Sequence, residues 1–237
     1  MIDEIGIGGF VMKQDAKFLK FGTDAMLLSE FAKVKKNDIV CDLGCGVGAI
    51  SLLLAARHEN IKIHGVEIVE GAACLAEENA KLNGIDNRMK IHNIDLKSVK
   101  EEFSAGSFDA VVSNPPFMKN GDGLKTGREE LLIARMEILC TIDDVCAAAS
   151  YLLKFGGSFS LVHRPSRLSD IFLALEKYNL APKRMRLVQD TVSAEPSLVL
   201  LEARKGGGSG MKLMPTLIIK NSDGTETDEI RAIYQRK

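Results

Sequence analysis

From residue 38 onward, short apolar segments rich in β-branched residues alternate with longer segments of helical spacing. The short segments are typical of buried strands, because they lack a polar face and end at turn-forming residues. We expect strands at 39–43, 61–66, 89–92, 108–112 and 158–163, near 185–188 and at 197–202, and helices at 50–57, 70–83, 142–153 and 166–178. Strands that alternate with helices form a parallel sheet covered on both faces, with right-handed crossovers. The sequence therefore predicts an α/β fold with a mostly parallel sheet of seven strands.

The first 35 residues precede this alternation. Glycine and polar residues favour a hairpin over 8–18, and helical spacing favours a helix over 23–33 with Thr23 or Asp24 as its N-cap. The expected organisation is an N-terminal extension, 1–35, followed by one main domain, 36–237.

Composition excludes several classes of protein. No apolar run reaches the roughly 18 residues of a membrane helix, and the acidic start of the chain is unlike a signal peptide, so we expect a cytoplasmic protein. The cysteines form no Cys-x2-Cys pair and the histidines are scattered, so no metal site is expected. Residues 1–149 hold 17 Lys and Arg against 23 Asp and Glu, net −6, whereas residues 150–237 hold 14 against 9, net +5. A basic second half is suited to a polyanionic partner.

The first expected strand runs into a glycine-rich turn, Asp42-Leu-Gly44-Cys-Gly46-Val-Gly48-Ala49. Glycines let the backbone turn sharply and approach a ligand, and the next helix presents unpaired N–H groups. Glu67 ends the second strand, where an acid that binds a ribose is expected. The pattern Gly-x-Gly-x-x-Ala also fits a nicotinamide dinucleotide, so the glycines alone leave the cofactor open.

The most informative segment is Ser113-Asn114-Pro115-Pro116-Phe117, directly after the fourth expected strand. Two prolines cannot continue a strand, so the chain leaves the sheet in an extended turn at the edge where open α/β sheets bind ligands. We expect the Asn114 side-chain oxygen and the Pro115 carbonyl to form two adjacent acceptors, with Phe117 as a stacking face. These groups suit an exocyclic –NH2 on a flat base, whose lone pair they would turn toward a methyl donor.

The Asp-x-Gly-x-Gly-x-Gly turn with Glu67 resembles motif I and the acidic loop of the class I S-adenosylmethionine-dependent methyltransferases, which have a Rossmann-like fold. The resemblance implies S-adenosylmethionine as cofactor: Asp42, Gly44, Gly46 and Gly48 would face its methionine part, and Glu67 its ribose. Asp95 would contact the adenine amino group. The Asn-Pro-Pro-Phe segment resembles that of amino methyltransferases acting on adenine, guanine or protein glutamine, which implies catalytic roles for Asn114, Pro115 and Phe117, with Asn114 also beside the cofactor.

A narrower resemblance covers nearly the whole chain. Phe21-Gly-Thr-Asp24-Ala-Met-Leu-Leu resembles a segment of the bacterial tRNA(Val) adenine-N6 methyltransferases, and so do stretches at 134–137, 162–168, 205–215 and 228–234. It implies methylation of adenine N6 in tRNA, at position 37 next to the anticodon, with Asp24 near the methionine end of the cofactor. We expect the protein to be a monomer. Thr216 and Met136 depart from the family pattern, which has proline and histidine there.

The RNA is expected to contact a basic set in the second half of the chain, namely Arg164, Arg167, Lys183, Arg184 and Arg186. The glycine-rich, basic loop 119–128 could order over the target nucleotide. The alternatives are an rRNA guanine-N2 methyltransferase, a protein-glutamine methyltransferase, a non-catalytic S-adenosylmethionine-binding RNA assembly factor and a nicotinamide-dependent oxidoreductase. The glutamine enzymes usually carry an N-terminal helical domain, for which 35 residues leave no room. An oxidoreductase gives no reason for Asn-Pro-Pro-Phe.

Overall fold

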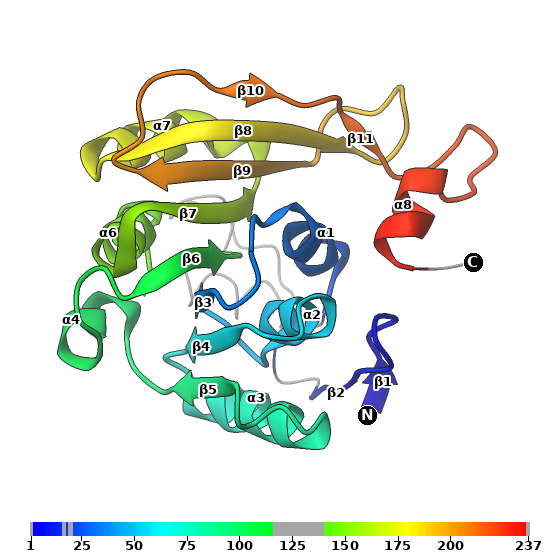
Figure 1. Cartoon of the computed structure of the whole chain (residues 1–237). Coiled ribbons are helices and arrows are strands. Elements are labelled where there is room, and N and C mark those ends of the chain that lie inside the picture. Colours follow the sequence, from blue (N-terminus) through cyan, green and yellow to red (C-terminus); the bar gives the residue numbers. More distant parts are fainter. Residues whose placement is uncertain (1, 16–17, 19–20, 116–139, 236–237) are drawn as a thin grey trace, which may run out of the picture.

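The computed structural model describes residues 2–15, 18, 21–115 and 140–235 (Figure 1). Its helices are α1 (Thr23–Phe31), α2 (Ala49–Arg57), α3 (Glu70–Leu82), α4 (Val99–Glu102), α6 (Ile142–Leu152), α7 (Leu168–Lys177) and α8 (Asp228–Ile233). Its strands are β1 (Ile2–Glu4), β2 (Val11–Lys13), β3 (Ile39–Leu43), β4 (Lys62–Val66), β5 (Met89–His92), β6 (Phe108–Ser113), β7 (Leu153–His163), β8 (Leu180–Gln189), β9 (Leu198–Lys205), β10 (Lys212–Leu213) and β11 (Leu217–Ile218).

A nine-stranded sheet is the centre of the described part of the chain. Its order is β5-β4-β3-β6-β7-β9-β8-β10, and β11 also pairs with β8. Strands β3 to β7 are parallel, whereas β9 runs antiparallel between β7 and β8. The expected α/β fold with a mostly parallel sheet is confirmed. The expected number of seven strands is wrong, because β10 and β11 add two residues each alongside β8, too few to show a periodic pattern.

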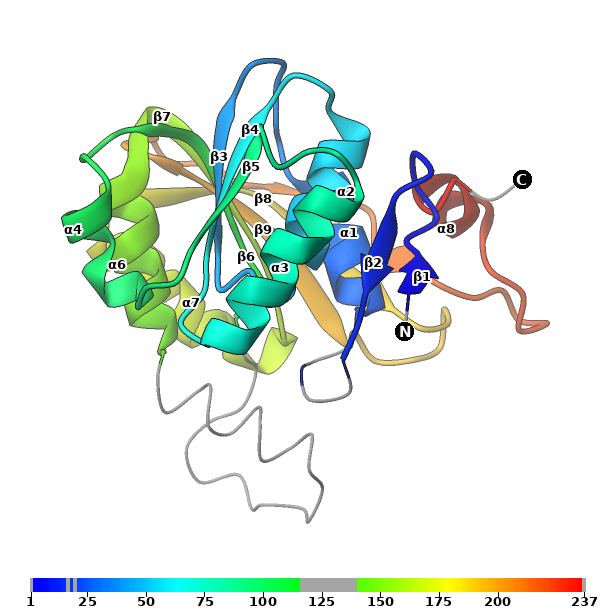
Figure 2. The same cartoon turned by 90° about the horizontal axis from the view of Figure 1, so that it is seen from below.

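Helices cover both faces of this sheet (Figure 2). α1, α2 and α3 pack on one face, and α4, α6 and α7 on the other. In β6, the neighbours Val111 and Val112 are both buried, Val111 in one hydrophobic cluster and Val112 in the other. A strand buried on both faces needs consecutive apolar residues, which the chain shows at Ala110, Val111 and Val112.

The N-terminal hairpin lies earlier in the chain than the sequence suggested. Ile2 pairs with Lys13, and the turn between β1 and β2 contains Gly6, Gly8 and Gly9, all with positive φ. The predicted hairpin over 8–18 is therefore wrong, because Gly8 belongs to the turn and not to a strand. Glycine tolerates positive φ, which explains the concentration of glycines at this point.

Two asparagines attach this hairpin to α3. Asn83 accepts a hydrogen bond from the Val11 N–H at 2.9 Å and donates to the Val11 carbonyl at 2.7 Å. Asn79 does the same for Lys13, at 2.7 and 3.1 Å. The two side chains lie one helical turn apart and satisfy the outer edge of β2 as another strand would. Met12, between them, is fully buried in the main core.

α1 begins without a side-chain cap. Its N-cap is Gly22, and no side-chain hydrogen bond caps the helix, so the expected capping by Thr23 or Asp24 is wrong. The Asp24 carboxylate instead accepts a hydrogen bond from the Asn114 side chain. Among the helices of the described residues, none has the length and apolar character of a membrane span.

Candidate active site

Parallel strands bring several predicted residues to one edge. β3, β4, β5, β6 and β7 all end there, because their pairings are parallel. The chain leaves these ends through the glycine turn, Glu67, Asp95, Asn114 and Arg164, in that order. The edge thus gathers one or more polar or glycine-rich segments from each central strand, as expected for a ligand site in an open α/β sheet.

The glycine turn has an open side and a packed side. Gly44, Gly46 and Gly48 have φ of 73°, 56° and 87°. A Cβ added at Gly44 or Gly46 would meet no atom within 4 Å, whereas at Gly48 it would lie 2.9 Å from Met89 Cε. The positive φ of Gly48 favours glycine, and its packed side leaves little space for a side chain, whereas Gly44 and Gly46 leave a backbone surface that a ligand can approach closely.

Glu67 holds the glycine turn in place. It is 2% exposed, and its two oxygens accept hydrogen bonds from the Gly46 N–H at 2.9 Å and the Val69 N–H at 2.8 Å. Burial raises its pKa, while these backbone hydrogen bonds act in the opposite direction. Each carboxylate oxygen has a second lone pair, so the group can still accept from a ligand hydroxyl.

Asn93 is a residue that the sequence analysis missed. Its side-chain amide donates to the Glu67 carbonyl at 2.8 Å and to the Ile68 carbonyl at 3.2 Å. It therefore fixes the loop after β4 from the neighbouring strand end. The only sequence signal is its position directly after β5, at the same edge as Glu67.

Asp42 is a fully buried carboxylate beside the turn. Its Oδ2 accepts from the Ser51 hydroxyl at 2.7 Å, whereas its Oδ1 has no hydrogen-bond partner among the described residues. Burial raises the pKa of Asp42 to about 7. An unpartnered carboxylate oxygen inside a protein is costly, and a cationic ligand group would relieve that cost.

Asp95 caps the short 3-10 helix Leu96–Ser98. Its Oδ1 accepts from the Lys97 N–H at 2.9 Å, and its Oδ2 lies 3.4 Å from Lys97 Nζ. The side chain lies at the carboxyl end of β5, as predicted, and its described role is to form this turn.

Asn114 and Asp24 meet at the end of β6. The Asn114 side-chain nitrogen donates to Asp24 Oδ2 at 2.8 Å, across 90 positions of sequence. The preceding Ser113 hydroxyl donates to the Leu43 carbonyl at 2.8 Å, which ties the end of β6 to β3. Pro115 is buried, whereas Pro116, Phe117 and the loop 119–128 lie outside the described residues.

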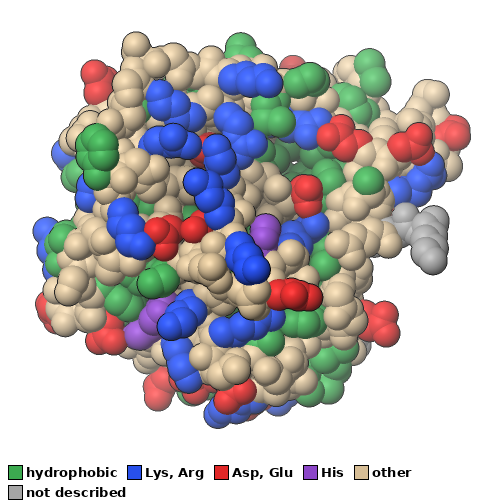
Figure 3. Space-filling view, in the orientation of Figure 1, with side chains coloured by type: hydrophobic (Ala, Val, Ile, Leu, Met, Phe, Trp, Pro, Cys, Tyr) green, Lys and Arg blue, Asp and Glu red, His purple; other side chains and the backbone are tan. Residues whose placement is uncertain are grey.

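The five basic residues predicted to bind RNA fall into two groups. Arg164 and Arg167 follow β7 at the carboxyl edge. There Arg164 donates to the Ser197 carbonyl at 3.1 Å, and Arg167 pairs with Asp170 at 2.8 Å. Lys183, Arg184 and Arg186 lie on β8, on a side of the molecule where Lys and Arg side chains gather (Figure 3).

The β8 residues have structural partners. Arg184 pairs with the buried Glu202 and lies 4.5 Å above the Phe31 ring, and Arg186 makes a bidentate pair with Glu229 at 2.7 and 2.8 Å. Lys183 donates to the Gly208 carbonyl. These contacts join α1, the C-terminal helix and the glycine-rich loop to the sheet.

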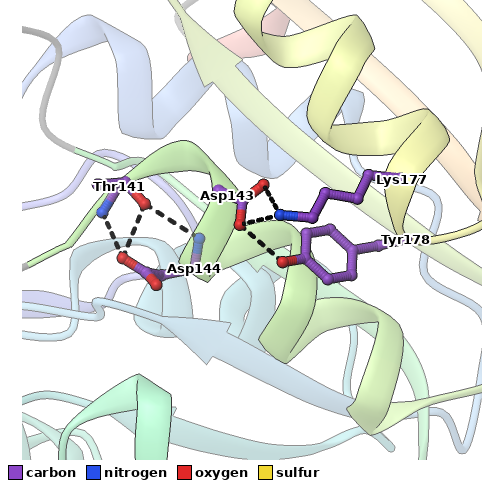
Figure 4. A network of polar contacts seen from close by, with 5 residues as sticks. All are labelled: Thr141, Asp143, Asp144, Lys177 and Tyr178. Carbon is purple, nitrogen blue, oxygen red and sulfur yellow. Dashed lines mark hydrogen bonds and ion pairs between the residues drawn. The ribbon is translucent and has the colours of Figure 1, made fainter.

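The chain after the Asn-Pro-Pro-Phe segment re-enters the described region at a firmly anchored helix. Thr141 and Asp144 form a capping box at the start of α6. Asp143 accepts from the Tyr178 hydroxyl at 2.6 Å and from Lys177 Nζ at 2.9 Å (Figure 4). Those hydrogen bonds lower the pKa of Asp143. They join α6 to the end of α7.

Comparison with known proteins matches this chain to methyltransferases. The sequence profile of the methyltransferase small domain family matches residues 16–168. The chain is 31% identical to a tRNA1(Val) (adenine(37)-N6)-methyltransferase of Porphyromonas gingivalis, over 82% of this chain and 78% of that protein. It is 29% identical to the enzyme of that name from Dickeya chrysanthemi, over 95% and 92%.

The chain belongs to the methyltransferase small domain family. The resemblance to the tRNA(Val) adenine-N6 methyltransferases implied by the sequence is confirmed. A crystal structure described as a predicted O-methyltransferase from Agrobacterium tumefaciens matches with a TM-score of 0.74 at 22% identity, covering 90% of this chain and 96% of that one, which shows the shared fold. The protein is a methyltransferase, and S-adenosylmethionine is the cofactor of its class. The nicotinamide alternative is therefore excluded.

The residues of this methyltransferase fit the cofactor. Gly44 and Gly46 leave room for close approach, and the buried, unpartnered Oδ1 of Asp42 suits an ammonium group. Glu67 can accept from ribose hydroxyls while it holds the turn. The assignment of Asp24, Asp42, Glu67 and Asp95 to particular cofactor atoms remains a prediction.

The methyltransferase should bind its cofactor more tightly as the pH rises. With a pKa of about 7, Asp42 is mostly neutral at pH 6 and mostly ionised at pH 8. If the ammonium group of the cofactor binds the ionised form, binding releases a proton and the affinity rises about tenfold between these pH values. Calorimetry with S-adenosylhomocysteine measures this. Asp42→Asn should remove the rise, and an unchanged pH dependence in that variant would contradict the role of Asp42.

Proposed function

We propose that the protein transfers the methyl group of S-adenosylmethionine to the N6 amino group of adenine in tRNA, at position 37 beside the anticodon. The observation that carries the proposal is the orientation of the Asn114 amide. Its nitrogen donates to Asp24, so its oxygen points away from that carboxylate and can serve as an acceptor. The names of the relatives support adenine in tRNA as the substrate.

The proposed chemistry needs alignment more than acid–base catalysis. The cofactor supplies a methyl group already activated by a positive sulfur. Asn114 Oδ1 and the Pro115 carbonyl would accept the two amino hydrogens, which points the nitrogen lone pair toward that methyl group. His163 is a poor candidate for a general base, because it is buried, its pKa is lowered to about 4, mainly by burial, and its Nδ1 accepts from the Arg164 N–H.

An assay with labelled S-adenosylmethionine tests the substrate. Total tRNA, total rRNA, duplex DNA and a protein extract are offered separately, and the labelled product is identified after digestion. The proposal predicts label in tRNA, recovered as N6-methyladenosine. Label recovered only as N2-methylguanosine in rRNA, or only in protein glutamine, would show one of the alternative activities and overturn the proposed substrate.

We also propose that Arg164 and Arg167 bind tRNA phosphates, because they lie at the edge that carries Asn114. Phosphate contacts make affinity fall with salt, so Arg164→Ala with Arg167→Ala should reduce the slope of log affinity against log salt by about 1 to 2. Filter binding to tRNA at several ionic strengths gives the slope. Cofactor affinity should stay unchanged.

Lys62 and Lys90 provide the matched control for that measurement. Both are exposed; Lys62 is the first residue of β4 and Lys90 the second residue of β5, so they lie on the amino-terminal side of the carboxyl edge that carries the proposed site. Their double replacement by alanine removes the same charge and should leave the slope near its wild-type value. Equal slopes for the two double variants would show that only net charge matters, against a phosphate site at Arg164 and Arg167.

We propose in addition that the protein acts as a monomer in the cytoplasm, without a bound metal. Light scattering of the tRNA-bound protein tests the first point, and a mass of two protein chains per complex would contradict it. If no metal is bound, the protein should keep its full activity after treatment with a chelator.

A further inference from the structure

Asp24 contacts the Asn114 amide and can fix its orientation. Its Oδ2 accepts from the Asn114 side-chain nitrogen at 2.8 Å, and its Oδ1 accepts from the Ala25 N–H at 2.9 Å. The second hydrogen bond fixes the carboxylate against its own helix. A Cβ added at Gly22 would lie 2.6 Å from Asp24 Oδ1, so the residue before the helix must lack a side chain for Asp24 to adopt this position.

Both partners stand on rigid elements. Asp24 is the second residue of α1, and the residues that follow it, from Ala25 to Leu28, are all buried in the core. Asn114 follows Ser113, which is itself buried and bonded to the Leu43 carbonyl. The contact therefore joins two side chains whose neighbouring residues are anchored in the core.

The chemistry of the amide makes this contact decisive. An asparagine side chain has an acceptor oxygen and a donor nitrogen of similar size, and it can turn to present either one. A carboxylate accepts only, so Asp24 requires the nitrogen of Asn114 to face it. The oxygen then faces the opposite way. In the reversed orientation the amide would present N–H groups to an amino group that also carries hydrogens.

We propose that Asp24 is a positioning residue that holds the Asn114 amide with its oxygen toward the amino group to be methylated. This inference rests on the proposed function and assigns Asp24 a role toward the acceptor amine, in place of the cofactor contact expected from the sequence. Because the hydrogen bond is charge-assisted, it also polarises the amide and strengthens the oxygen as an acceptor.

A reciprocal exchange tests the proposal. Asp24→Asn removes the orienting charge and should lower the turnover number about 10- to 100-fold, with affinity for S-adenosylhomocysteine within about threefold of wild type. Asn114→Asp places two carboxylates in contact and should lower turnover more than about a hundredfold. The double variant Asp24→Asn/Asn114→Asp restores a charge-assisted hydrogen bond and still presents a carboxylate oxygen to the amine. Its turnover should recover to within about tenfold of wild type.

Two outcomes would overturn the positioning role. One is a double variant that is no more active than the better single variant, although all variants melt near the wild-type temperature. The other is a loss of cofactor affinity in Asp24→Asn that accounts for its whole loss of activity, which would make Asp24 a cofactor ligand.

A second measurement does not depend on the substrate. In ¹⁵N NMR spectra of the cofactor-free protein, one proton of the Asn114 side-chain amide should be shifted downfield by Asp24 and should move upfield in Asp24→Asn. An unchanged resonance would contradict the contact. If wild type fails to methylate tRNA while this shift is present, the proposed function fails and the orientation of Asn114 by Asp24 stands.

Discussion

Asn114→Ala is expected to lower the turnover number for methyl transfer by about a thousandfold, and to leave affinity for S-adenosylhomocysteine within about threefold of wild type. The physical reason is that different residues along the carboxyl edge would bind the cofactor and the acceptor amine. We propose that the glycine turn with Asp42 and Glu67 binds the cofactor, and that Asn114, whose nitrogen donates to Asp24, offers its oxygen to the acceptor amine. Removing it leaves the amine without the acceptor that orients its lone pair, and Asp24 without its donor.

Single-turnover kinetics with tRNA and calorimetry with S-adenosylhomocysteine together measure this separation. Asn87→Ala serves as the control, because Asn87 is an exposed asparagine in the turn that precedes β5, at the other edge of the sheet. It should keep both activity and affinity. Retention of more than about a tenth of wild-type activity in Asn114→Ala would show that the acceptor role is misassigned.

Glu67→Ala should have the opposite effect: it should weaken cofactor binding and largely spare methyl transfer. We expect cofactor affinity to fall by about 1–3 kcal/mol, roughly 5- to 150-fold, because the variant loses an acceptor for the ligand and leaves the Gly46 and Val69 N–H groups without their partner. Activity at saturating cofactor should recover much of its wild-type value, since the acceptor side is unchanged.

Calorimetry of Glu67→Ala and of Glu70→Ala makes the comparison. Glu70 is exposed in the first turn of α3, three residues away, and its replacement should leave affinity unchanged. The cofactor affinity of Glu67→Gln should lie between those of Glu67→Ala and Glu70→Ala, because the glutamine amide nitrogen would face one of the two backbone donors. Affinity of Glu67→Ala equal to that of the control would remove Glu67 from the cofactor site.

The parts of the site that could be predicted carry strong local signals. Glycines with positive φ at 44, 46 and 48 and the prolines after Asn114 constrain the backbone wherever they occur. Once the strands are recognised as parallel, their ends must lie at one edge, so Glu67, Asp95 and Asn114 were predictable neighbours of the glycine turn.

The remaining features depend on contacts between distant segments. The hydrogen bond from Asn114 to Asp24 spans 90 positions, and nothing in either segment specifies which amide atom faces the carboxylate. Asn79 and Asn83 look like ordinary polar helix residues until β2 lies beside them. Arg184 and Arg186 resemble other exposed cations, and only the structure shows their pairing with Glu202 and Glu229. Such pairings are tertiary, so sequence periodicity does not contain them.

The most direct test of the proposed function is mass spectrometry of tRNA from a strain that lacks this gene, compared with its parent. Nucleosides and ribonuclease fragments are analysed together, so that both the modification and its position are measured. We predict that N6-methyladenosine at position 37 of tRNA(Val) is present in the parent, absent from the deletion strain and restored by the wild-type gene but not by Asn114→Ala. Unchanged N6-methyladenosine at that position in the deletion strain would contradict it.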